Sequence, residues 1–338
     1  MYKKKYGFLF IIIVIFVLFY LVLLRNKHAP IVFEKANAIT VACVNFNPEW
    51  GDKKTNLQKI KNQIIKAAQN DADIVIFPEL ALTGYSISND KKMHKLNAET
   101  IPGPSTSEIL KLTQKYDLFV IFGMPEKSKD NPEIYYNSAA VVGPKKIEGA
   151  YRKLMPYPNE LTWCTKGNLP FYFNTQWGIV GIGICYDTFM FPELPRFYAA
   201  LGARLYINVT AISPFLGWKE YYLNQLNARA IENMMYVASA NLTGKDLWTN
   251  FLGTSLIVGP AKKNHMVKYY CSIADEDKEE IVIATIDLSN VDRMRKKYPL
   301  FSVDSEGNSP QWRLDLYINM LKIIKEKTYL DTLSNFNN

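Results

Sequence analysis

Short runs of apolar and β-branched residues alternate with amphipathic helical patterns from residue 39 to about residue 325. The run at 39–46, ITVACVNF, predicts a buried strand, and the segment at 56–70 then repeats apolar residues at helical spacing. Further strands are predicted at 74–77, 119–123, 138–142, 178–185, 205–209, 236–241, 254–258 and 281–286, and further helices at 105–116, 193–202, 218–235 and 291–297. Ser105 and Glu108 form a capping-box pattern at the start of one of these helices. This alternation predicts a single α/β domain over residues 39–325.

An uncharged and overwhelmingly apolar run of 18 residues, Gly7–Leu24, lies close to the N-terminus. At about 1.5 Å per helical residue it spans roughly 27 Å, near the hydrocarbon thickness of a bilayer. A cleaved signal peptide is the alternative, but its apolar core is normally shorter, and no small-residue cleavage site follows directly. We therefore predict a cytoplasmic Lys tail, one transmembrane helix and a linker over residues 1–38, and a polar tail over residues 326–338. The flanking charges favour a single-pass membrane protein with its folded domain on the extracytoplasmic side.

The formal net charge of +8 is concentrated in the N-terminal segment, where the first 38 residues carry +5. The remaining 300 residues therefore carry only +3, without the basic clusters that a nucleic-acid surface needs. The four cysteines form no CxxC pair, and the three histidines are widely scattered. We expect no nucleic-acid partner, no metal and no Cys–His protease. The cysteines are Cys43, Cys164, Cys185 and Cys271, and the histidines are His28, His94 and His265.

Three chemically capable residues each follow or adjoin a predicted strand. Glu79 comes directly after the buried strand at 74–77, where it could act as a base, although a surface glutamate is the commoner explanation. Lys153 could stabilise an oxyanion, or it could belong to a solvated basic turn. Cys185 ends a glycine-containing apolar strand, where it could be a nucleophile or a buried structural cysteine. Each signal is modest by itself.

Taken together, Glu79, Lys153 and Cys185 resemble the Glu–Lys–Cys triad of the nitrilase (carbon–nitrogen hydrolase) superfamily in order and separation. The resemblance covers roughly residues 39–320. It extends to three further segments, the ARAIEN-like helix at 227–233, FLGTS at 251–255 and RLDLY at 313–317.

The resemblance implies an α-β-β-α sandwich that forms homodimers or larger homo-oligomers, with Glu160 as a second glutamate in the site. It also implies that Glu79 takes the thiol proton while Cys185 attacks an amide or nitrile carbon. Lys153 and the backbone N–H of Tyr186 then stabilise the tetrahedral species. No cofactor is implied, and the partner is a small-molecule amide or nitrile.

The subfamily signals conflict. The segment at 152–156 with Glu160 and Trp163 is similar to true nitrilases, whereas Cys-Tyr-Asp at 185–187 and Phe-Pro-Glu at 191–193 resemble the amidase branches. The intervening residues at 188–190 again resemble nitrilases. Candidate substrate-binding residues are Tyr85, Trp163, Thr188 and Phe189.

An amidase is the favoured function. A nitrilase is the first alternative, and the predicted membrane segment adds a third, an N-acyltransferase that passes the acyl group to an amine. A binding relative without enzyme activity is the fourth, although such a protein would usually have lost a triad residue.

Overall fold

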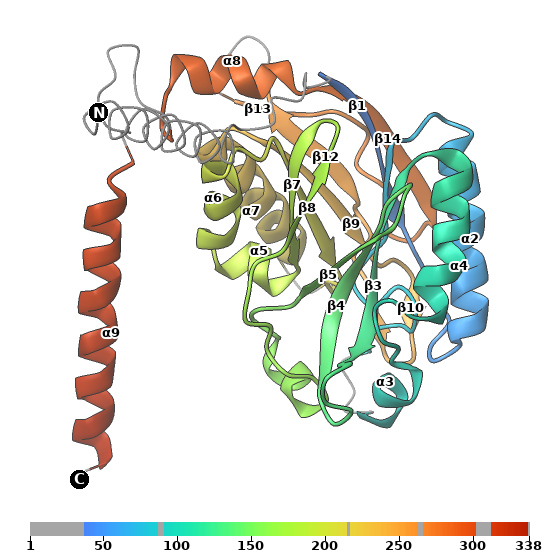
Figure 1. The fold of residues 1–338 in the computed structure, drawn as a ribbon, viewed down its shortest axis with the longest axis horizontal. Helices are drawn as coiled ribbons and strands as arrows, with labels where there is room; N and C mark the ends of the chain where they lie inside the picture. Colours follow the sequence, from blue (N-terminus) through green and yellow to red (C-terminus); the bar gives the residue numbers. More distant parts are fainter. Residues whose placement is uncertain (1–36, 87–90, 215–216, 262–265, 302–311, 337–338) are drawn as a thin grey trace, which may run out of the picture. The chain divides into compact units, whose positions relative to one another are not determined.

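Two six-stranded sheets face each other, and helices cover their outer faces (Figure 1). The computed structural model describes residues 37–86, 91–214, 217–261, 266–301 and 312–336. In spatial order the first sheet consists of β14 (Glu280–Asp287), β1 (Ala38–Asn45), β2 (Ile74–Ile76), β3 (Phe119–Lys127), β4 (Tyr135–Val142) and β5 (Ile147–Arg152). The second consists of β13 (Val267–Tyr269), β12 (Leu256–Pro260), β9 (Tyr236–Asn241), β8 (Leu205–Thr210), β7 (Gly178–Ile184) and β6 (Tyr172–Thr175).

The two sheets share one pattern of strand pairing. The three central strands of each sheet, β1–β2–β3 and β7–β8–β9, are parallel, and every other pairing in the two sheets is antiparallel. Parallel strands need helical connections, so the central strands are those that the alternating sequence pattern predicts best. Their carboxyl ends are also where side chains of an α/β site gather.

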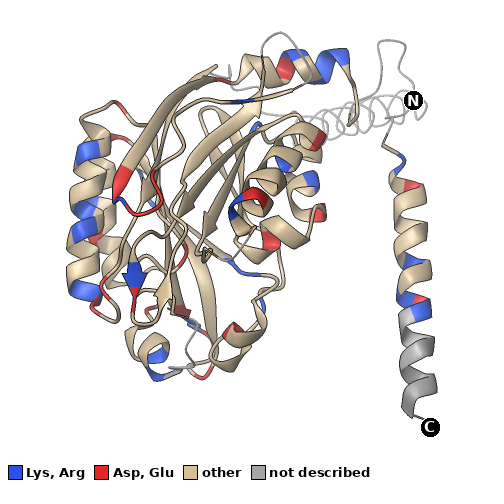
Figure 2. Cartoon of the chain, turned by 180° about the vertical axis from the view of Figure 1, so that it is seen from behind, with Lys and Arg blue, Asp and Glu red and all other residues tan. Residues whose placement is uncertain are grey.

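The helices lie on the outer faces in two groups. Helices α2 and α4 cover the first sheet, and α6 and α7 cover the second (Figure 1). Figure 2 shows Lys and Arg mainly on helices and loops, while the strands are mostly free of charge. The helix bounds are α2 (Lys53–Ala68), α3 (Lys91–Asn97), α4 (Pro104–Tyr116), the 3₁₀ turn η1 (Pro158–Thr162), α5 (Tyr186–Met190), α6 (Glu193–Ala200), α7 (Trp218–Asn233), α8 (Ser289–Lys297) and α9 (Leu314–Phe336); a small hairpin is formed by β10 (Lys245–Asp246) and β11 (Thr249–Asn250).

The central strands β1, β2 and β3 of the first sheet are buried on both faces. Successive side chains of a strand point to opposite sides, so neighbouring residues enter different buried clusters. Val41 of β1 belongs to the same buried cluster as Ile182 of β7, which lies in the facing sheet. The next residue, Ala42, belongs instead to the cluster of Ile60, on α2. Burial on both faces of the sheet explains why the sequence of β1 is almost continuously apolar. It also agrees with the predicted sandwich of two sheets between helices.

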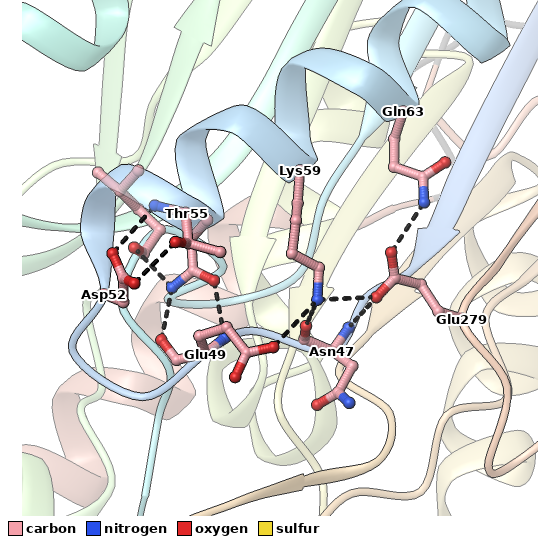
Figure 3. Close-up of polar contacts among 9 residues, drawn as sticks. Asn47, Glu49, Asp52, Thr55, Lys59, Gln63 and Glu279 are labelled. Carbon is pink, nitrogen blue, oxygen red and sulfur yellow. Dashed lines mark hydrogen bonds and ion pairs between the residues drawn. The ribbon is translucent and has the colours of Figure 1, made fainter.

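A polar network ties the start of α2 to the segment that precedes β14 (Figure 3). Lys59 Nζ lies 3.2 Å from Glu279 Oε2 and also donates to the Asn47 carbonyl. Gln63 Nε2 donates to Glu279 Oε1 at 2.9 Å. Asp52 caps the helix by accepting the backbone N–H of its third residue at 3.0 Å. The network therefore joins helix α2 to the segments that follow β1 and precede β14, which are far apart in sequence.

Two local expectations differ from the structure. Helix α4 begins at Pro104 rather than at Ser105, because Gly103 is the N-cap residue and its N–H donates to Thr106 Oγ1 at 2.8 Å. The N–H and hydroxyl of Ser105 are instead bonded to Glu99 at 2.7 and 2.9 Å. The expected polar tail at 326–338 is helical as far as Phe336, within α9. Its sequence retains apolar residues at helical spacing, which the polar composition obscured.

The predicted membrane span at 7–24 lies outside the described residues. Within the described ranges, no helix combines the length and the apolarity needed to cross a bilayer.

Candidate active site

The three triad candidates follow three different strands. Glu79 lies just after β2 and Lys153 directly after β5, both in the first sheet, whereas Cys185 directly follows β7 in the second. The side chains of Glu79 and Lys153 are completely buried. The structure places the carboxylate and the ammonium in direct contact, and it brings the thiol to the same region, since the charges of both groups shift the pKa of Cys185.

Lys153 bridges two carboxylates. Its Nζ lies 2.6 Å from Glu79 Oε1 and 2.7 Å from Glu160 Oε1. Asn137, on β4, donates from Nδ2 to Glu79 Oε1 at 2.7 Å and to Glu160 Oε2 at 3.3 Å. The Tyr85 hydroxyl donates to Glu160 Oε1 at 2.7 Å. These bonds hold both glutamates, so Glu160, expected from the resemblance, lies within the same network.

One oxygen of the Glu79 carboxylate remains available. Its Oε2 is buried and has no hydrogen-bond partner among the described residues. Burial raises the pKa of Glu79 to about 7, with Lys153 lowering it and Glu160 raising it. Burial lowers the pKa of Lys153, but Glu160 and Glu79 outweigh burial, and its pKa lies well above the ordinary value. The cluster thus combines a permanent cation with a carboxyl group that can exchange a proton near neutral pH.

Cys185 occupies a tight connection between β7 and α5. Its backbone has φ 48° and ψ −103°, its N–H donates to Val209, and its carbonyl accepts from Thr188 at 2.9 Å. Burial and the Glu79 charge raise the pKa of the Cys185 thiol to about 12, while Lys153 and the nearby Thr210 side chain lower it. The resting group is therefore a thiol, and a base is needed to make it nucleophilic.

Tyr186 is the first residue of α5. The first N–H groups of a helix have no acceptor within the helix, and they carry the positive end of its dipole. The backbone N–H of Tyr186 therefore lies where an oxyanion formed at Cys185 could be bound.

A cavity of about 240 Å³ opens above the half-buried Cys185. Half of its lining residues are aromatic: Tyr85, Tyr157, Tyr186, Phe189, Trp218 and Tyr221. The others are Asn159, Cys185, Met190, Ala211, Ile212 and Ser213.

Two of the four predicted substrate-binding residues, Tyr85 and Phe189, line this cavity. Trp163 does not line it, because its ring is buried and stacks on His94 with ring centroids 4.4 Å apart. Thr188 is also fully buried, and its hydroxyl pairs with the Tyr206 hydroxyl at 2.7 Å. Thr188, three residues after the nucleophile, thus belongs to the core, while its neighbour Phe189 lines the pocket.

Sequence reasoning missed two carboxylates that position the site. Asp187 accepts the Tyr151 hydroxyl and the Met155 N–H, both at 2.7 Å, and so holds the residues on either side of Lys153. Asp246 accepts the N–H of Tyr85 at 2.6 Å. Asp187 was visible as part of Cys-Tyr-Asp, whereas Asp246 and Asn137 carry no local sequence signal.

The ARAIEN-like motif acts on the turn that carries the nucleophile. Arg229, on α7, donates from Nε to the Thr188 carbonyl at 2.8 Å and from Nη2 to the Phe189 carbonyl at 3.0 Å. Its third contact is with Glu232 at 3.1 Å. A cation at the last carbonyls of a helix is favourable, so Arg229 stabilises α5 at the end opposite Cys185.

Over the described residues, no cluster of three or more His, Cys, Asp or Glu side chains is arranged to hold a metal ion. The ionisable groups that the structure gathers at the site are the thiol of Cys185, the carboxylates of Glu79 and Glu160 and the ammonium of Lys153.

Solved structures share this architecture. Nit3 of Saccharomyces cerevisiae, a member of branch 10 of the nitrilase superfamily, has a TM-score of 0.69 and 25% identity, over 79% of this chain and 96% of that chain. An amidase from Nesterenkonia sp. has a TM-score of 0.62 and 21% identity, over 79% of this chain and 97% of that chain. The fold is thus that of the nitrilase-type α/β proteins.

Sequence comparison assigns the family. The profile of the carbon-nitrogen hydrolases matches residues 40–296. A probable nitrilase of Schizosaccharomyces pombe is 33% identical over 80% of this chain and 95% of its own length. A 2-oxoglutaramate amidase of Bacillus subtilis is 30% identical over 78% of this chain and 96% of its own length. The chain belongs to the carbon–nitrogen hydrolase family of the nitrilase superfamily.

Proposed function

We propose that this protein is an amidase that hydrolyses a non-peptide carbon–nitrogen bond through a thioester on Cys185. The observation that carries the proposal is the free Oε2 of Glu79 in a cluster where Lys153 binds its other oxygen. The Phe-Pro-Glu segment at 191–193 and the amidases among the relatives favour amides as substrates.

The first half of the reaction acylates the enzyme. Glu79 takes the thiol proton as Cys185 Sγ attacks the amide carbon, because the raised pKa of the thiol leaves little free thiolate. Lys153 Nζ and the Tyr186 N–H stabilise the oxyanion. The carbon–nitrogen bond then breaks, and Glu79 returns its proton to the departing amine. Ammonia leaves from a primary amide.

The second half releases the acid. Water attacks the thioester carbon while Glu79 accepts one of its protons, and Glu160 helps to orient the water. Collapse of the tetrahedral species breaks the carbon–sulfur bond, and the thiolate recovers the proton from Glu79. A carboxyl group that is half-protonated near pH 7 suits both steps.

A nitrilase is the second candidate, favoured by two relatives with that name. One is the probable nitrilase of Schizosaccharomyces pombe, and the other is a nitrilase of Pyrococcus abyssi that is 31% identical over 74% of this chain. Ammonia release from matched amides and nitriles distinguishes the candidates. If the nitrile is hydrolysed and the matched amide is not, the protein is a nitrilase and the amidase proposal is wrong. Transfer of the acyl group to an added amine would identify an acyltransferase.

The roles of the two glutamates are tested by mass spectrometry of the Cys185 adduct. Glu79→Gln should prevent acylation, because the thiol proton then has no acceptor. Glu160→Gln should reduce turnover and yet allow an acyl-enzyme to accumulate. Accumulation in the Glu79 variant and never in the Glu160 variant would reverse these roles.

A further inference from the structure

The cavity above Cys185 has no charged side chain on its walls, within the residues that the structure describes. Met190, Ala211 and Ile212 add aliphatic surface to the aromatic rings. Two of the hydroxyls are already engaged, since Tyr85 donates to Glu160 and Tyr221 contacts Met190 Sδ at 3.0 Å. An acyl chain in this cavity therefore meets mainly hydrocarbon and ring surfaces.

Two buried cations of the site region, Lys153 and Arg229, are bound to other partners. Lys153 is bound by the carboxylates of Glu79 and Glu160, so the charged cluster below the thiol holds two acids for one base. Arg229 is bound to two backbone carbonyls of α5 and to Glu232. A substrate carboxylate would lose its hydration without gaining an ion pair, and the two acids would repel it.

A cationic acyl group fits poorly as well. No carboxylate lines the described walls of the cavity. The rings also pack edge to face, with interplanar angles of 85° for Tyr157 and Tyr186 and 70° for Trp218 and Tyr221. Ring faces covered by neighbouring edges are less accessible for cation–π binding.

We propose that the substrate is an amide whose acyl group is an uncharged, mainly hydrocarbon chain. This inference rests on the proposed amidase function and adds the substrate class. The volume agrees with it, because a dry apolar cavity of roughly 150 Å³ suffices to hold benzene and this cavity has about 240 Å³. The class excludes mono-amides of dicarboxylic acids as preferred substrates.

Three amides of matched shape test the charge preference. They are 5,5-dimethylhexanamide, 4-(trimethylammonio)butanamide and glutaramate, which place a neutral, a positive and a negative group at the same distance from the amide. We expect kcat/KM for the neutral amide to exceed that of each charged one by at least about 100-fold. Comparable or better turnover of either charged amide would overturn the proposal.

A second arm varies chain length from acetamide through butyramide to hexanamide. Burial of each methylene should raise kcat/KM about fourfold until the cavity is filled. A flat or falling series would contradict an apolar acyl site.

A third arm introduces a positive charge into the wall of the cavity. Met190 lines the cavity and is half exposed. Met190→Arg should raise kcat/KM for glutaramate about tenfold relative to Met190→Gln, the neutral control of similar length. An equal response of the two variants would mean that the acyl chain does not occupy this cavity, and it would overturn the proposal.

Failure of the amidase proposal can be distinguished from failure of the acyl-group proposal. If no amide is turned over, the amidase proposal fails, and binding to Cys185→Ala protein decides the acyl preference by calorimetry. Tightest binding of 5,5-dimethylhexanamide supports the apolar site, and tightest binding of either charged amide overturns it.

Discussion

At the scale of single residues, the backbone of Cys185 is the most constrained feature of the site. Its φ of 48° and ψ of −103° lie in a region that side-chain-bearing residues rarely adopt. Such strain is of order 1–3 kcal/mol and persists only where surrounding contacts impose it. Here those contacts are the bonds of Cys185 to Val209 and Thr188.

Replacement of Cys185 separates chemistry from strain. Cys185→Ala should abolish turnover while changing the free energy of unfolding by less than about 1 kcal/mol, because the half-buried thiol contributes little packing. Cys185→Gly should be more stable than Cys185→Ala by about 1 kcal/mol, since glycine tolerates positive φ. Chemical denaturation and amide turnover measure both effects. Cys271→Ala is the control and should remain active; retained activity in Cys185→Ala would refute the mechanism.

The carboxyl group of Glu79 predicts the acid limb of the pH profile. Its pKa is raised to about 7, mainly by burial, and only the ionised form can accept the thiol proton. The acylation rate should therefore fall as the pH drops below about 7, approaching tenfold per unit, and level off above it. Stopped-flow acylation with an activated substrate measures this limb. A rate that is constant from pH 5 to 8 would exclude Glu79 as the base.

At the scale of elements, the nucleophile depends on a one-and-a-half-turn helix that packing holds in place. Helix α5 is too short to be stable alone, and its last carbonyls are bound by Arg229 from α7. The planar guanidinium reaches the two carbonyls with two different nitrogens, Nε and Nη2, and the single nitrogen of a lysine does not reproduce this geometry.

Arg229→Lys should therefore misplace Cys185 while keeping the charge. We expect kcat to fall about tenfold and the free energy of unfolding to decrease by about 1–3 kcal/mol. Arg196→Lys is the matched control, because the hydrogen bond that Arg196 makes in the described part of the chain, to the Glu232 carbonyl, and its position over the Phe301 ring can both be kept by a lysine. Equal effects of the two substitutions would mean that the contact with α5 has no special role in catalysis.

The sequence predicts most of the long elements well and the short ones poorly, although the 23-residue helix α9 was not predicted. The strand at 236–241 has the predicted bounds, and all its residues are buried, as expected for a strand inside a sheet that is covered on both faces. Elements α3, β5, β6 and α5 were missed, because segments of four to seven residues give too little periodicity.

The candidate site shows the same limit. The resemblance to a known family, in order and separation, predicted Glu79, Lys153 and Cys185. The structure places Glu79 and Lys153 in contact and Cys185 within reach of their charges. Asn137 was missed, since one asparagine in a strand has no local signature. The direction of Thr188 could not be predicted either, because it depends on the turn that begins with the unusual backbone of Cys185.

At the scale of the whole molecule, the domain can be separated from the N-terminal segment only upstream of β1. The Asn37 carbonyl accepts from Leu288 N at 2.7 Å, and the Ala38 carbonyl accepts from Trp177 Nε1 at 2.8 Å. The first bond connects the start of β1 to the end of β14, and the second connects it to the turn between β6 and β7. Residues 37 and 38 therefore belong to the fold.

A protein that begins at Ala36 should be soluble and active on small amides. The full chain should sediment with membranes and resist extraction by salt or alkali, because Gly7–Leu24 can span a bilayer. Protease added to intact cells should remove the domain if it is extracytoplasmic. Full-length protein that is soluble without detergent, or a mature N-terminus between residues 24 and 38, would contradict the anchor.

The pairing of β1 with β14 has a consequence for synthesis on the ribosome. The register joins Asn45 to Glu280, so the first strand to be made pairs with one of the last. At about 5–20 residues per second, β1 waits roughly ten to fifty seconds for this neighbour. The open edge of the nascent sheet is a potential site of misassociation during that interval. Nascent chains stalled before residue 280 should therefore lack activity, even though Glu79, Lys153 and Cys185 have all been synthesised.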